Sequence, residues 1–447
     1  IFARAQYDYD GKYFFSASFR RDASSRFSKD NRWGNFGSVG AAWLLTKEDF
    51  MKDLTWINSL KYKVSWGVQG NDNILYSNKE PNYYAYRDQY TMTYNNGSYS
   101  LVMKYKGNKD LTWETSYSFN TGFEFELLNR RLNGSFDFFY RKTDDLLFNN
   151  PVPVSSGITT GSIPINAFNV SNTGFEIDLN GVIIKTKDIE WAANLNLTHY
   201  KNKILKLTDE LDAQGGQKGA YYIRRVGGSL YESYLKRFAG VDPDNGQALY
   251  YVDPDNGDWS TTSNYDNAQL SDCGDILPKV YGGFGTTIKA YGFDLSASFS
   301  YQLGGKFYDG TYQSFMHNGG SGMQGFNWHK DILNAWTPEN RYTNVPRLDA
   351  SDACYQLDSD RYLVSSNYLS VNNITLGYTL PKSLLEKIGI SGLRVYVSGD
   401  NLGVISARKG LDPRESFGLG SSTHDSGASQ SSYSVMKSIV GGISLTF

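Results

Sequence analysis

Apolar and polar residues alternate with a period of two along many segments of this chain. The last segment shows the pattern most clearly, over ten residues that end on an aromatic ring. Such a run is long enough to cross a bilayer as a tilted strand, so it predicts the closing strand of a membrane-spanning β-barrel. One predicted face holds Ile439, Gly441, Ile443, Leu445 and Phe447, and the other holds Ser438, Val440, Gly442, Ser444 and Thr446.

The same alternation recurs at 116–127, 132–140, 189–198 and 293–301. It indicates strands with one apolar and one polar face. The fold class that we predict is therefore all-β, a transmembrane up-and-down antiparallel β-barrel. About fifteen strands are predicted, near 2–10, 13–22, 33–45, 59–69, 114–128, 131–143, 168–182, 189–202, 231–241, 247–253, 280–290, 293–303, 368–380, 393–401 and 432–447.

The links between these strands alternate in length. With Phe447 placed on the periplasmic side, every short link falls on that side and every long loop on the extracellular side, as in an up-and-down barrel. The 247–253 strand has the weakest pattern, but this alternation requires it. The short links lie at 10–12, 46–58, 129–130, 183–188, 291–292 and 381–392, and the long links at 70–113, 144–167, 203–230, 254–279, 304–367 and 402–431. We expect a helical turn in 46–58 and another in 381–392.

Composition agrees with a membrane barrel. The 34 Tyr, 25 Phe and 9 Trp suit two interfacial aromatic girdles, although a Tyr-rich soluble β-protein is the alternative. The chain is 40% hydrophobic and contains no run of 18 apolar residues, so no transmembrane helix is expected. A net charge of −2 gives no basic surface for nucleic acid. The start at Ile1, without a signal peptide, is interpreted as that of a mature fragment.

The sequence gives little support for catalysis. None of the four histidines lies in a metal or triad motif, and no G-x-S-x-G elbow is present. We therefore expect no enzyme activity and no cofactor. Cys273 and Cys354 lie in predicted extracellular loops, and the sequence is compatible either with a disulfide between them or with two free thiols.

Two kinds of binding residue stand out in the long loops. The acidic turn at 253–258 offers Asp253, Asp255 and Asp258 as weak calcium candidates, but it lacks a bidentate Glu, and ordinary turn chemistry explains it better. Aromatic rings could stack on sugars or peptide side chains, or could simply pack the loops together. The ligand-binding candidates are Trp259, Tyr265, Trp328, His329 and Tyr355.

Short motifs along the whole chain resemble the SusC/RagA family of TonB-dependent outer-membrane transporters. Each motif alone is weak, and their number and order give the match its strength. They are YDYDGKY at 7–13, SFRRD at 18–22, NRWG at 31–34, AW at 42–43, EDF at 48–50, GVQGN at 67–71, LTWET at 111–115, GVDP at 240–243, AWTPEN at 335–340, VPR at 345–347, LGYTLP at 376–381, NL at 401–402 and GISLTF at 442–447.

The resemblance implies a 22-stranded barrel with an internal plug, a TonB box ahead of the plug, and a SusD-like surface lipoprotein that closes over the barrel. Residues 1–447 would then be the C-terminal portion of the barrel, about its last fifteen strands. Plug, TonB box and first strands would lie outside this sequence. The expected partners are the lipoprotein lid, the TonB complex, the remaining barrel and plug, and outer-membrane lipid.

The function that this resemblance implies is TonB-dependent import of a bulky oligosaccharide or oligopeptide across the cell outer membrane. Two alternatives remain at this point. One is an adhesive or structural surface barrel whose long loops bind an extracellular partner, and the other is a passive porin.

Overall fold

The computed structural model describes residues 1–76, 80–95, 97–158, 161–219, 221–323, 325–352, 355–385, 389–407, 410–414 and 435–447. The chain forms two compact units. The first contains Ile1–Val182, Asn196–Gly216 and Arg225–Gly228, and the second contains Ile183–Leu195, Gln217–Arg224 and Ser229–Phe447.

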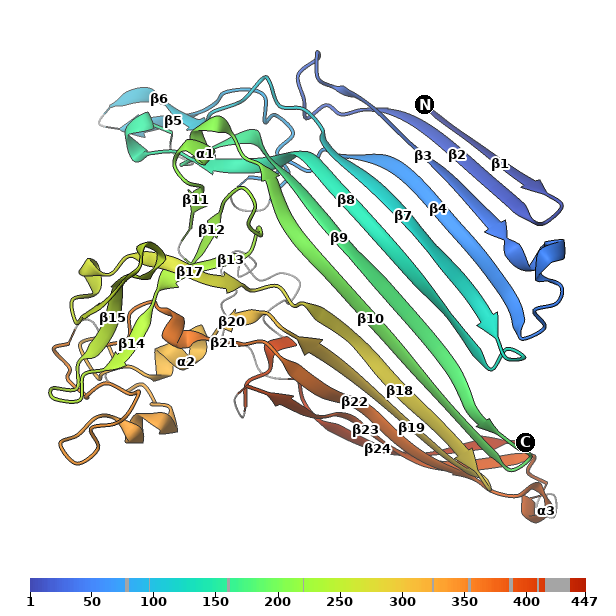
Figure 1. Cartoon of the computed structure of the whole chain (residues 1–447). Helices are drawn as coiled ribbons and strands as arrows, with labels where there is room; N and C mark the ends of the chain where they lie inside the picture. The colour runs from blue at the N-terminus through green and yellow to red at the C-terminus, as the bar shows by residue number, and fades with distance from the viewer. Residues whose placement is uncertain are drawn as a thin grey trace. The chain divides into compact units, whose positions relative to one another are not determined.

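The first unit is built on long antiparallel strands that lie side by side in chain order (Figure 1). Two of them, of 20 and 24 residues, are far longer than the 9–11 residues that cross a bilayer, so they extend beyond it. The predicted long link at 144–167 is therefore mostly strand. These strands are β1 (Phe2–Tyr9), β2 (Tyr13–Ala23), β3 (Trp33–Leu44), β4 (Ile57–Asn71), β7 (Glu114–Leu127), β8 (Leu132–Pro151), β9 (Ser162–Lys185) and part of β10 (Ile189–Lys206).

The second unit repeats this design with β18 (Val280–Ala290), β19 (Phe293–Leu303), β22 (Tyr368–Thr379), β23 (Gly392–Ser406) and β24 (Ser438–Thr446). Each pairs antiparallel with the next. Tyr291 and Gly292 join β18 to β19 with positive φ angles of 51° and 87°, which match the right-handed twist of a two-residue hairpin. The short link predicted here is confirmed.

Strand register places the predicted faces as expected. Because paired residues share a face, the register aligns one apolar row across six strands of the first unit, and Tyr62 and Phe123 in it have ring centroids 5.1 Å apart. This row is Tyr9, Tyr13, Trp43, Tyr62, Phe123 and Phe136. It lies near the short-link ends of the strands, as expected for an aromatic girdle.

Thirteen of the fifteen predicted barrel strands belong to the main sheet, and two do not. The prediction for 231–241 and 247–253 is wrong, because these segments form small sheets within one long link. Their apolar positions fill loop cores: Leu235 and Tyr250 are almost fully buried. The removal of two strands changes the number of crossings by an even number. Short links therefore still fall at one end of the main strands and long links at the other.

The small sheets of this link have four and three strands. The first contains β11 (Gln217–Lys218), β12 (Tyr222–Arg224), β13 (Glu232–Lys236) and β17 (Leu270–Asp275), and the second contains β14 (Phe238–Val241), β15 (Ala248–Asp253) and β16 (Asp258–Thr262). Another long link contains a separate hairpin of β5 (Gln89–Asn95) and β6 (Ser98–Tyr105), and β20 (Lys306–Tyr308) pairs with β21 (Leu363–Ser365).

Helical segments are short and lie in the links. The turn expected in 46–58 is present as two 3₁₀ segments, η1 (Leu45–Lys47) and η2 (Asp49–Met51), and the turn in 381–392 as α3 (Lys382–Leu385). Among the described residues, no helix has the length and apolar character needed to span a membrane. The remaining helical segments of the described chain are α1 (Asp209–Ala213), α2 (Gly310–Phe315), η3 (Val154–Ser156), η4 (Pro254–Asn256), η5 (Tyr265–Asn267), η6 (Lys330–Asn334) and η7 (Asp360–Tyr362).

The face assignment is testable at two adjacent residues of β19. Phe299 stacks on Phe284 of the apolar face, with ring centroids 4.8 Å apart, whereas Ser298 points to the polar face. A lysine on the lipid side of a barrel costs about 2–4 kcal/mol at mid-membrane. We expect Phe299→Lys to reduce the folded fraction strongly and the matched control Ser298→Lys to leave it unchanged, measured by heat-modifiable gel mobility in the complete protein. Equal folded fractions would contradict the assignment.

Candidate functional site

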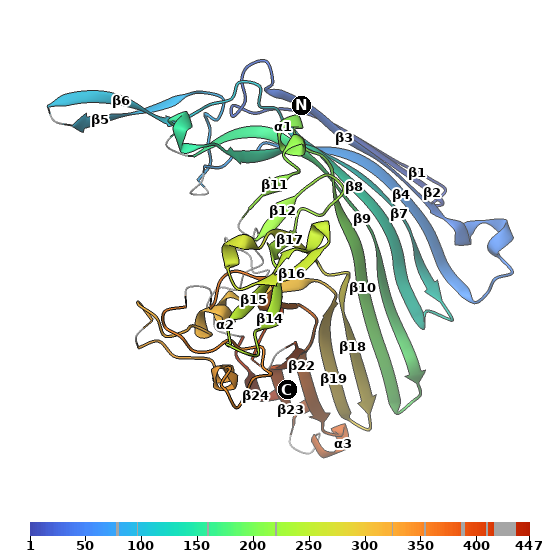
Figure 2. The ribbon, with the colours of Figure 1, turned by 60° about the vertical axis from the view of Figure 1, so that its left-hand side comes forward.

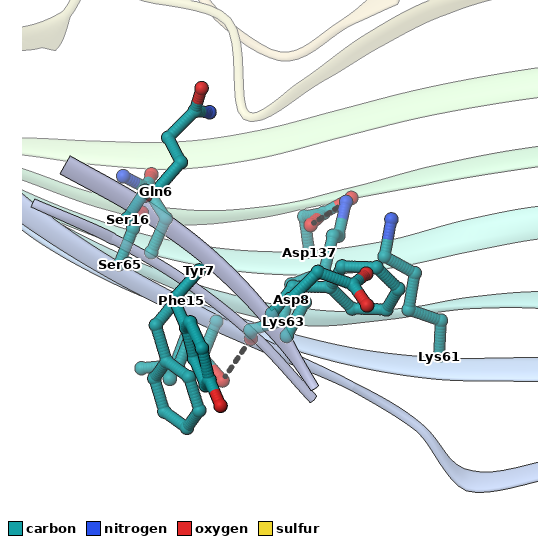
Figure 3. Close-up of a pocket in the computed structure, with 16 residues that line it drawn as sticks. Gln6, Tyr7, Asp8, Phe15, Ser16, Lys61, Lys63, Ser65 and Asp137 are labelled. Carbon is teal, nitrogen blue, oxygen red and sulfur yellow. Dashed lines mark hydrogen bonds and ion pairs between the residues drawn. The ribbon is translucent and has the colours of Figure 1, made fainter. Parts of the chain in front are cut away.

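The polar face of the first unit contains a group of four charged side chains, and Figure 3 labels three of them, Lys61, Lys63 and Asp137. Lys63 Nζ lies 2.8 Å from Glu124 Oε1 and 3.2 Å from Asp137 Oδ1, and Lys61 Nζ lies 3.4 Å from Glu124 Oε2. Two lysines and two carboxylates therefore neutralise one another across β4, β7 and β8. All four side chains are partly exposed, so the network contributes modestly to stability and mainly fixes the direction of the side chains.

A glycine makes this network possible. In the register, Gly122 of β7 lies between Lys63 of β4 and Asp137 of β8. A Cβ at Gly122 would lie 2.4 Å from Asp137 Oδ1, which is closer than such atoms approach. The absence of a side chain on the middle strand therefore lets Lys63 and Asp137 meet across it.

A shallow hollow of about 590 Å³ runs along β1, β2, β3 and β4 to β7 and β8, and Lys61, Lys63 and Asp137 of this group line it. Gly40, Ala41 and Ala42 have small side chains, which leave space for the hollow. Figure 3 shows Gln6, Ser16 and Lys61 on one side of the strands, with Tyr7 and Phe15 on the other. The hydroxyl, amide and charged groups of the first side suit a hydrated surface that contacts polar molecules or another polar segment.

The second unit has a matching ion pair. Arg394 of β23 donates two hydrogen bonds to Asp294 of β19, from Nε to Oδ1 at 2.9 Å and from Nη2 to Oδ2 at 2.5 Å. Gly377 of β22 lies between them, and a Cβ there would lie 2.5 Å from Arg394 Nη2 and 2.6 Å from Asp294 Oδ1. The same device, an ion pair across a glycine, thus occurs in both units.

Two long links, 207–279 and 304–367, lie mostly in the second unit and fold together there. The Tyr265 hydroxyl donates to the Asp358 carbonyl oxygen at 2.6 Å, and the backbone N–H of Phe238 donates to Asp360 Oδ1 at 2.7 Å. The Lys306 ammonium donates to the carbonyl oxygen of Cys273. We call the part of these links that lies in the second unit the loop platform.

Asp360 makes the platform sensitive to pH. Burial raises the pKa of its carboxyl, against the hydrogen bond from Phe238 and the positive charge of Arg237. A raised pKa means that the folded platform binds the proton more tightly than the unfolded chain does. The contribution of Asp360 to stability is therefore greatest at low pH and falls as the pH rises from the unfolded pKa through the folded one.

The aromatic candidates of the 207–279 link differ in exposure. Trp259 of β16 is about half exposed and packs edge-on against Tyr251, with centroids 5.2 Å apart. Tyr265 holds the platform together instead, because its hydroxyl is bonded to Asp358 and the Lys236 ammonium lies 3.8 Å from its ring centroid. Ligand contact by Trp259 and Tyr265 stays a prediction.

Trp328 and His329 are neighbours with different partners. Trp328 stacks on the buried ring of His317 at 4.9 Å and donates from Nε1 to the His317 carbonyl oxygen at 2.7 Å, yet half of it remains exposed. His329 Nδ1 accepts from the backbone N–H of Asp331 at 3.2 Å, so it caps η6. Ligand contact by either residue stays a prediction.

Tyr355 does not share the exposure of Trp259 and Trp328. It is 1% exposed and packs in a loop core with Met316, Ile332, Ala335 and Val345. The ring is closed to solvent and packs within this loop core, which favours the packing alternative, and ligand contact by Tyr355 stays a prediction.

The acidic turn at 253–258 uses its carboxylates locally. Asp253 accepts from Asn256 Nδ2 at 2.8 Å, Asp255 from the backbone N–H of Asp272 at 3.1 Å, and Asp258 from Ser260 Oγ at 2.6 Å. In the part of the chain that the structure describes, no three Asp, Glu, His or Cys residues are placed to hold a metal ion. Asp253 and Asp258 make the hydrogen bonds of ordinary turns, Asp255 bonds to β17, and calcium binding by the three residues stays a prediction.

Cys273 is a buried free thiol in β17. Its Sγ donates weakly to the Ser271 and Leu235 carbonyl oxygens at 3.5 and 3.7 Å. Burial raises the pKa of this thiol to about 11. Cys354 lies outside the described residues.

The sequence analysis missed one exposed surface, the β5–β6 hairpin, which extends away from the long strands of its unit (Figure 2). Its register places five large side chains on one face, each more than half exposed: Tyr90, Met92, Tyr94, Tyr99 and Leu101. The alternating pattern around the Asn-Gly pair at 96–97 could have revealed it, because that pair is a strong hairpin signal.

Comparisons with known proteins agree with this architecture. The family model described as "TonB dependent receptor-like, beta-barrel" matches residues 1–315. The TonB-dependent receptor P3 of Formosa agariphila is 30% identical over 432 residues, which cover 93% of this chain and 42% of that protein. The TonB-dependent receptor SusC of Bacteroides thetaiotaomicron is 30% identical, over 94% of this chain and 41% of that protein.

Among solved structures, that of the RagAB peptide transporter matches with a TM-score of 0.83 and 30% sequence identity, covering 100% of this chain and 47% of the other. The chain thus spans less than half the length of these relatives. The resemblance to the SusC/RagA family stated from the sequence motifs is confirmed, as is the fold class of antiparallel barrel strands.

The role of Gly377 can be tested by adding one methyl group. We expect Gly377→Ala to force Arg394 and Asp294 apart and to lower the free energy of unfolding by about 1 kcal/mol, because the pair is partly exposed. The matched control is Gly403→Ala on β23, where a Cβ meets no atom within 4 Å. Denaturant unfolding in detergent measures both, and equal midpoints for the two variants would contradict the assignment.

The burial of Cys273 predicts an unreactive thiol. In a Cys354→Ser background we expect no maleimide labelling of the folded protein at pH 8, and complete labelling after denaturation, because both the high pKa and the packing suppress the thiolate. Mass spectrometry of the intact protein gives the readout, with the Cys273→Ser form as the blank. Rapid labelling of the folded protein would show that the platform is open there.

Proposed function

The chain belongs to the TonB-dependent receptor-like β-barrel family, and we propose that it is the C-terminal portion of the barrel of an active importer. Its place is the outer membrane, where the apolar face of its strands meets lipid. The observation that carries the proposal is the match of the whole chain to the RagAB transporter at a TM-score of 0.83. Plug, TonB box and first strands would be supplied by the rest of a longer polypeptide, as the lengths of the relatives suggest.

The proposed cargo is a bulky hydrophilic nutrient, an oligosaccharide or an oligopeptide. RagAB, whose structure this chain matches, is a peptide transporter. In this chain, the polar face offers charges held in fixed directions by Lys63 and Arg394, together with the amides and hydroxyls of the hollow. Such a wall can hydrogen-bond either class of cargo. Energy would come from TonB acting on the plug rather than from a reaction at these residues.

The proposed partner is a SusD-like surface lipoprotein that closes over the barrel mouth. Two surfaces at the long-link ends support this proposal. One is the loop platform, which presents Trp259 and Trp328 half exposed. The other is the apolar face of the β5–β6 hairpin, because Tyr and Met are enriched in protein interfaces and an isolated two-stranded hairpin is marginally stable in water.

Growth on the transported nutrient distinguishes active import from a passive porin and from an adhesin. In the native organism, we expect deletion of the complete gene to abolish growth on either oligosaccharides or oligopeptides as the sole nutrient of that class. Loss of TonB should give the same defect. Growth that persists without TonB would indicate a passive porin, and normal growth of the deletion strain with loss of surface attachment would indicate an adhesin.

The hairpin gives a more specific prediction. We expect the combined change Tyr94→Ser, Tyr99→Ser to reduce the amount of copurified lipoprotein at least fivefold, because it removes the two most exposed rings of that face. The matched control is Thr91→Ala, Thr93→Ala on the opposite face of the same hairpin. Quantitative mass spectrometry of the detergent-purified complex gives the ratio. Full retention of the lipoprotein by the Tyr variant would exclude this face from the contact.

A further inference from the structure

Four large apolar side chains are exposed at the short-link end of the first unit. Phe50, Leu54 and Trp56 lie in the link between β3 and β4, and Leu128 lies in the turn between β7 and β8. Their exposed fractions range from 38% to 63%. The backbone N–H of Leu128 donates to the Trp56 carbonyl oxygen at 2.7 Å, so the link and the turn are in contact. We call these four residues the turn-side patch.

The patch continues the lipid-facing surface of the strands. The ring of Phe50 packs edge-on against Trp43, with centroids 6.3 Å apart, and Trp43 belongs to the aromatic row of the apolar face. Trp43 in turn stacks on Tyr13 at 6.2 Å. The apolar surface therefore passes from the strands onto the link without a polar break at Phe50.

The polar groups of this region mark the depth of the membrane surface. Glu48 of the link accepts from the Tyr13 hydroxyl at 2.6 Å and from Trp43 Nε1 at 3.0 Å. These two hydrogen bonds lower the pKa of the Glu48 carboxyl, which favours its charged form. Rings that turn their apolar bodies to the strands and their polar atoms to a carboxylate have the arrangement that Tyr and Trp adopt at a bilayer interface.

Leu128 supplies an independent observation. Its φ angle is +57°, a conformation that a side chain with a Cβ adopts at a cost and that glycine or asparagine adopts more easily. In water, the exposed leucine side chain is not buried, so nothing offsets the energetic cost of this backbone conformation. A surrounding of lipid would give the side chain a favourable environment in the same position. The neighbouring Arg130 and Lys52 pair with Glu126 and Asp49 but are largely exposed, and their side chains are long enough to reach lipid phosphates.

We propose that the turn-side patch lies in the headgroup region of the bilayer leaflet next to the short links, with phospholipid as its partner. Phe50 and Leu54 enter the boundary between headgroups and acyl chains, and Leu128 extends this contact to the β7–β8 turn. The link from 45 to 56 is then a membrane-surface element rather than a free turn. The inference needs only the membrane location of the strands and is independent of the cargo and of the lid.

Site-directed nitroxide labels test the proposal in the complete protein. Labels are placed singly at Phe50, Leu54 and Leu128 of a variant with both cysteines changed to Ser, and at Asp53 as the matched control on the same link, which is exposed and acidic. The protein is reconstituted in vesicles of phosphatidylethanolamine and phosphatidylglycerol. The measurement is the ratio of collision rates with oxygen, which concentrates in lipid, and with a water-soluble nickel chelate.

We expect the oxygen-to-nickel ratio at Phe50 and Leu54 to exceed that at Asp53 at least threefold, with Leu128 intermediate. Ratios equal to that at Asp53 would place the patch in water and overturn the proposal. Low collision rates with both reagents would show that protein covers the patch, which would overturn it as well. Heat-modifiable gel mobility checks that each labelled protein is folded. If the label at Phe50 prevents folding, the label at Leu54 decides the outcome.

Discussion

Backbone hydrogen bonding within a bilayer is the constraint on which this structure depends. No water is available at membrane depth, so each N–H and C=O of a crossing strand must be paired with a neighbouring strand. Pairing fixes the register, and the register assigns every second side chain to lipid. The row from Tyr62 to Phe123 and Phe136 exists because the strands align at those residues, and a slip of one position would turn Glu124 and Asp137 to lipid instead.

Glycine has a specific use within this register. Gly122 and Gly377 each occupy the middle strand of a group of three, and each leaves room for an ion pair between the outer two strands. Such pairs tie strands that are not hydrogen-bonded neighbours. They also hold Lys63 and Arg394 in place without burying charge. The polar face therefore stays hydrated while its charged side chains keep fixed directions.

The two ends of the strands serve different purposes. At the short-link end, the aromatic row, Glu48 and the turn-side patch form a surface suited to the membrane interface. At the other end, long links fold into cores of their own, and Tyr265 and Asp360 join two of them into the loop platform. The paired strands thus form the wall, and the exposed rings Trp259 and Trp328 are displayed by the links.

The sequence by itself determined the strand faces, thirteen of the main strands, the family and the tight turns such as that at 291–292, because these depend on local periodicity and local backbone preference. It could not assign 231–241 and 247–253, since strands of a loop sheet and strands of a barrel alternate alike. Only the tertiary structure separated exposed Trp259 from buried Tyr355, and only it brought Lys63 to Asp137, because contacts between residues far apart in the chain follow from register and packing rather than from spacing.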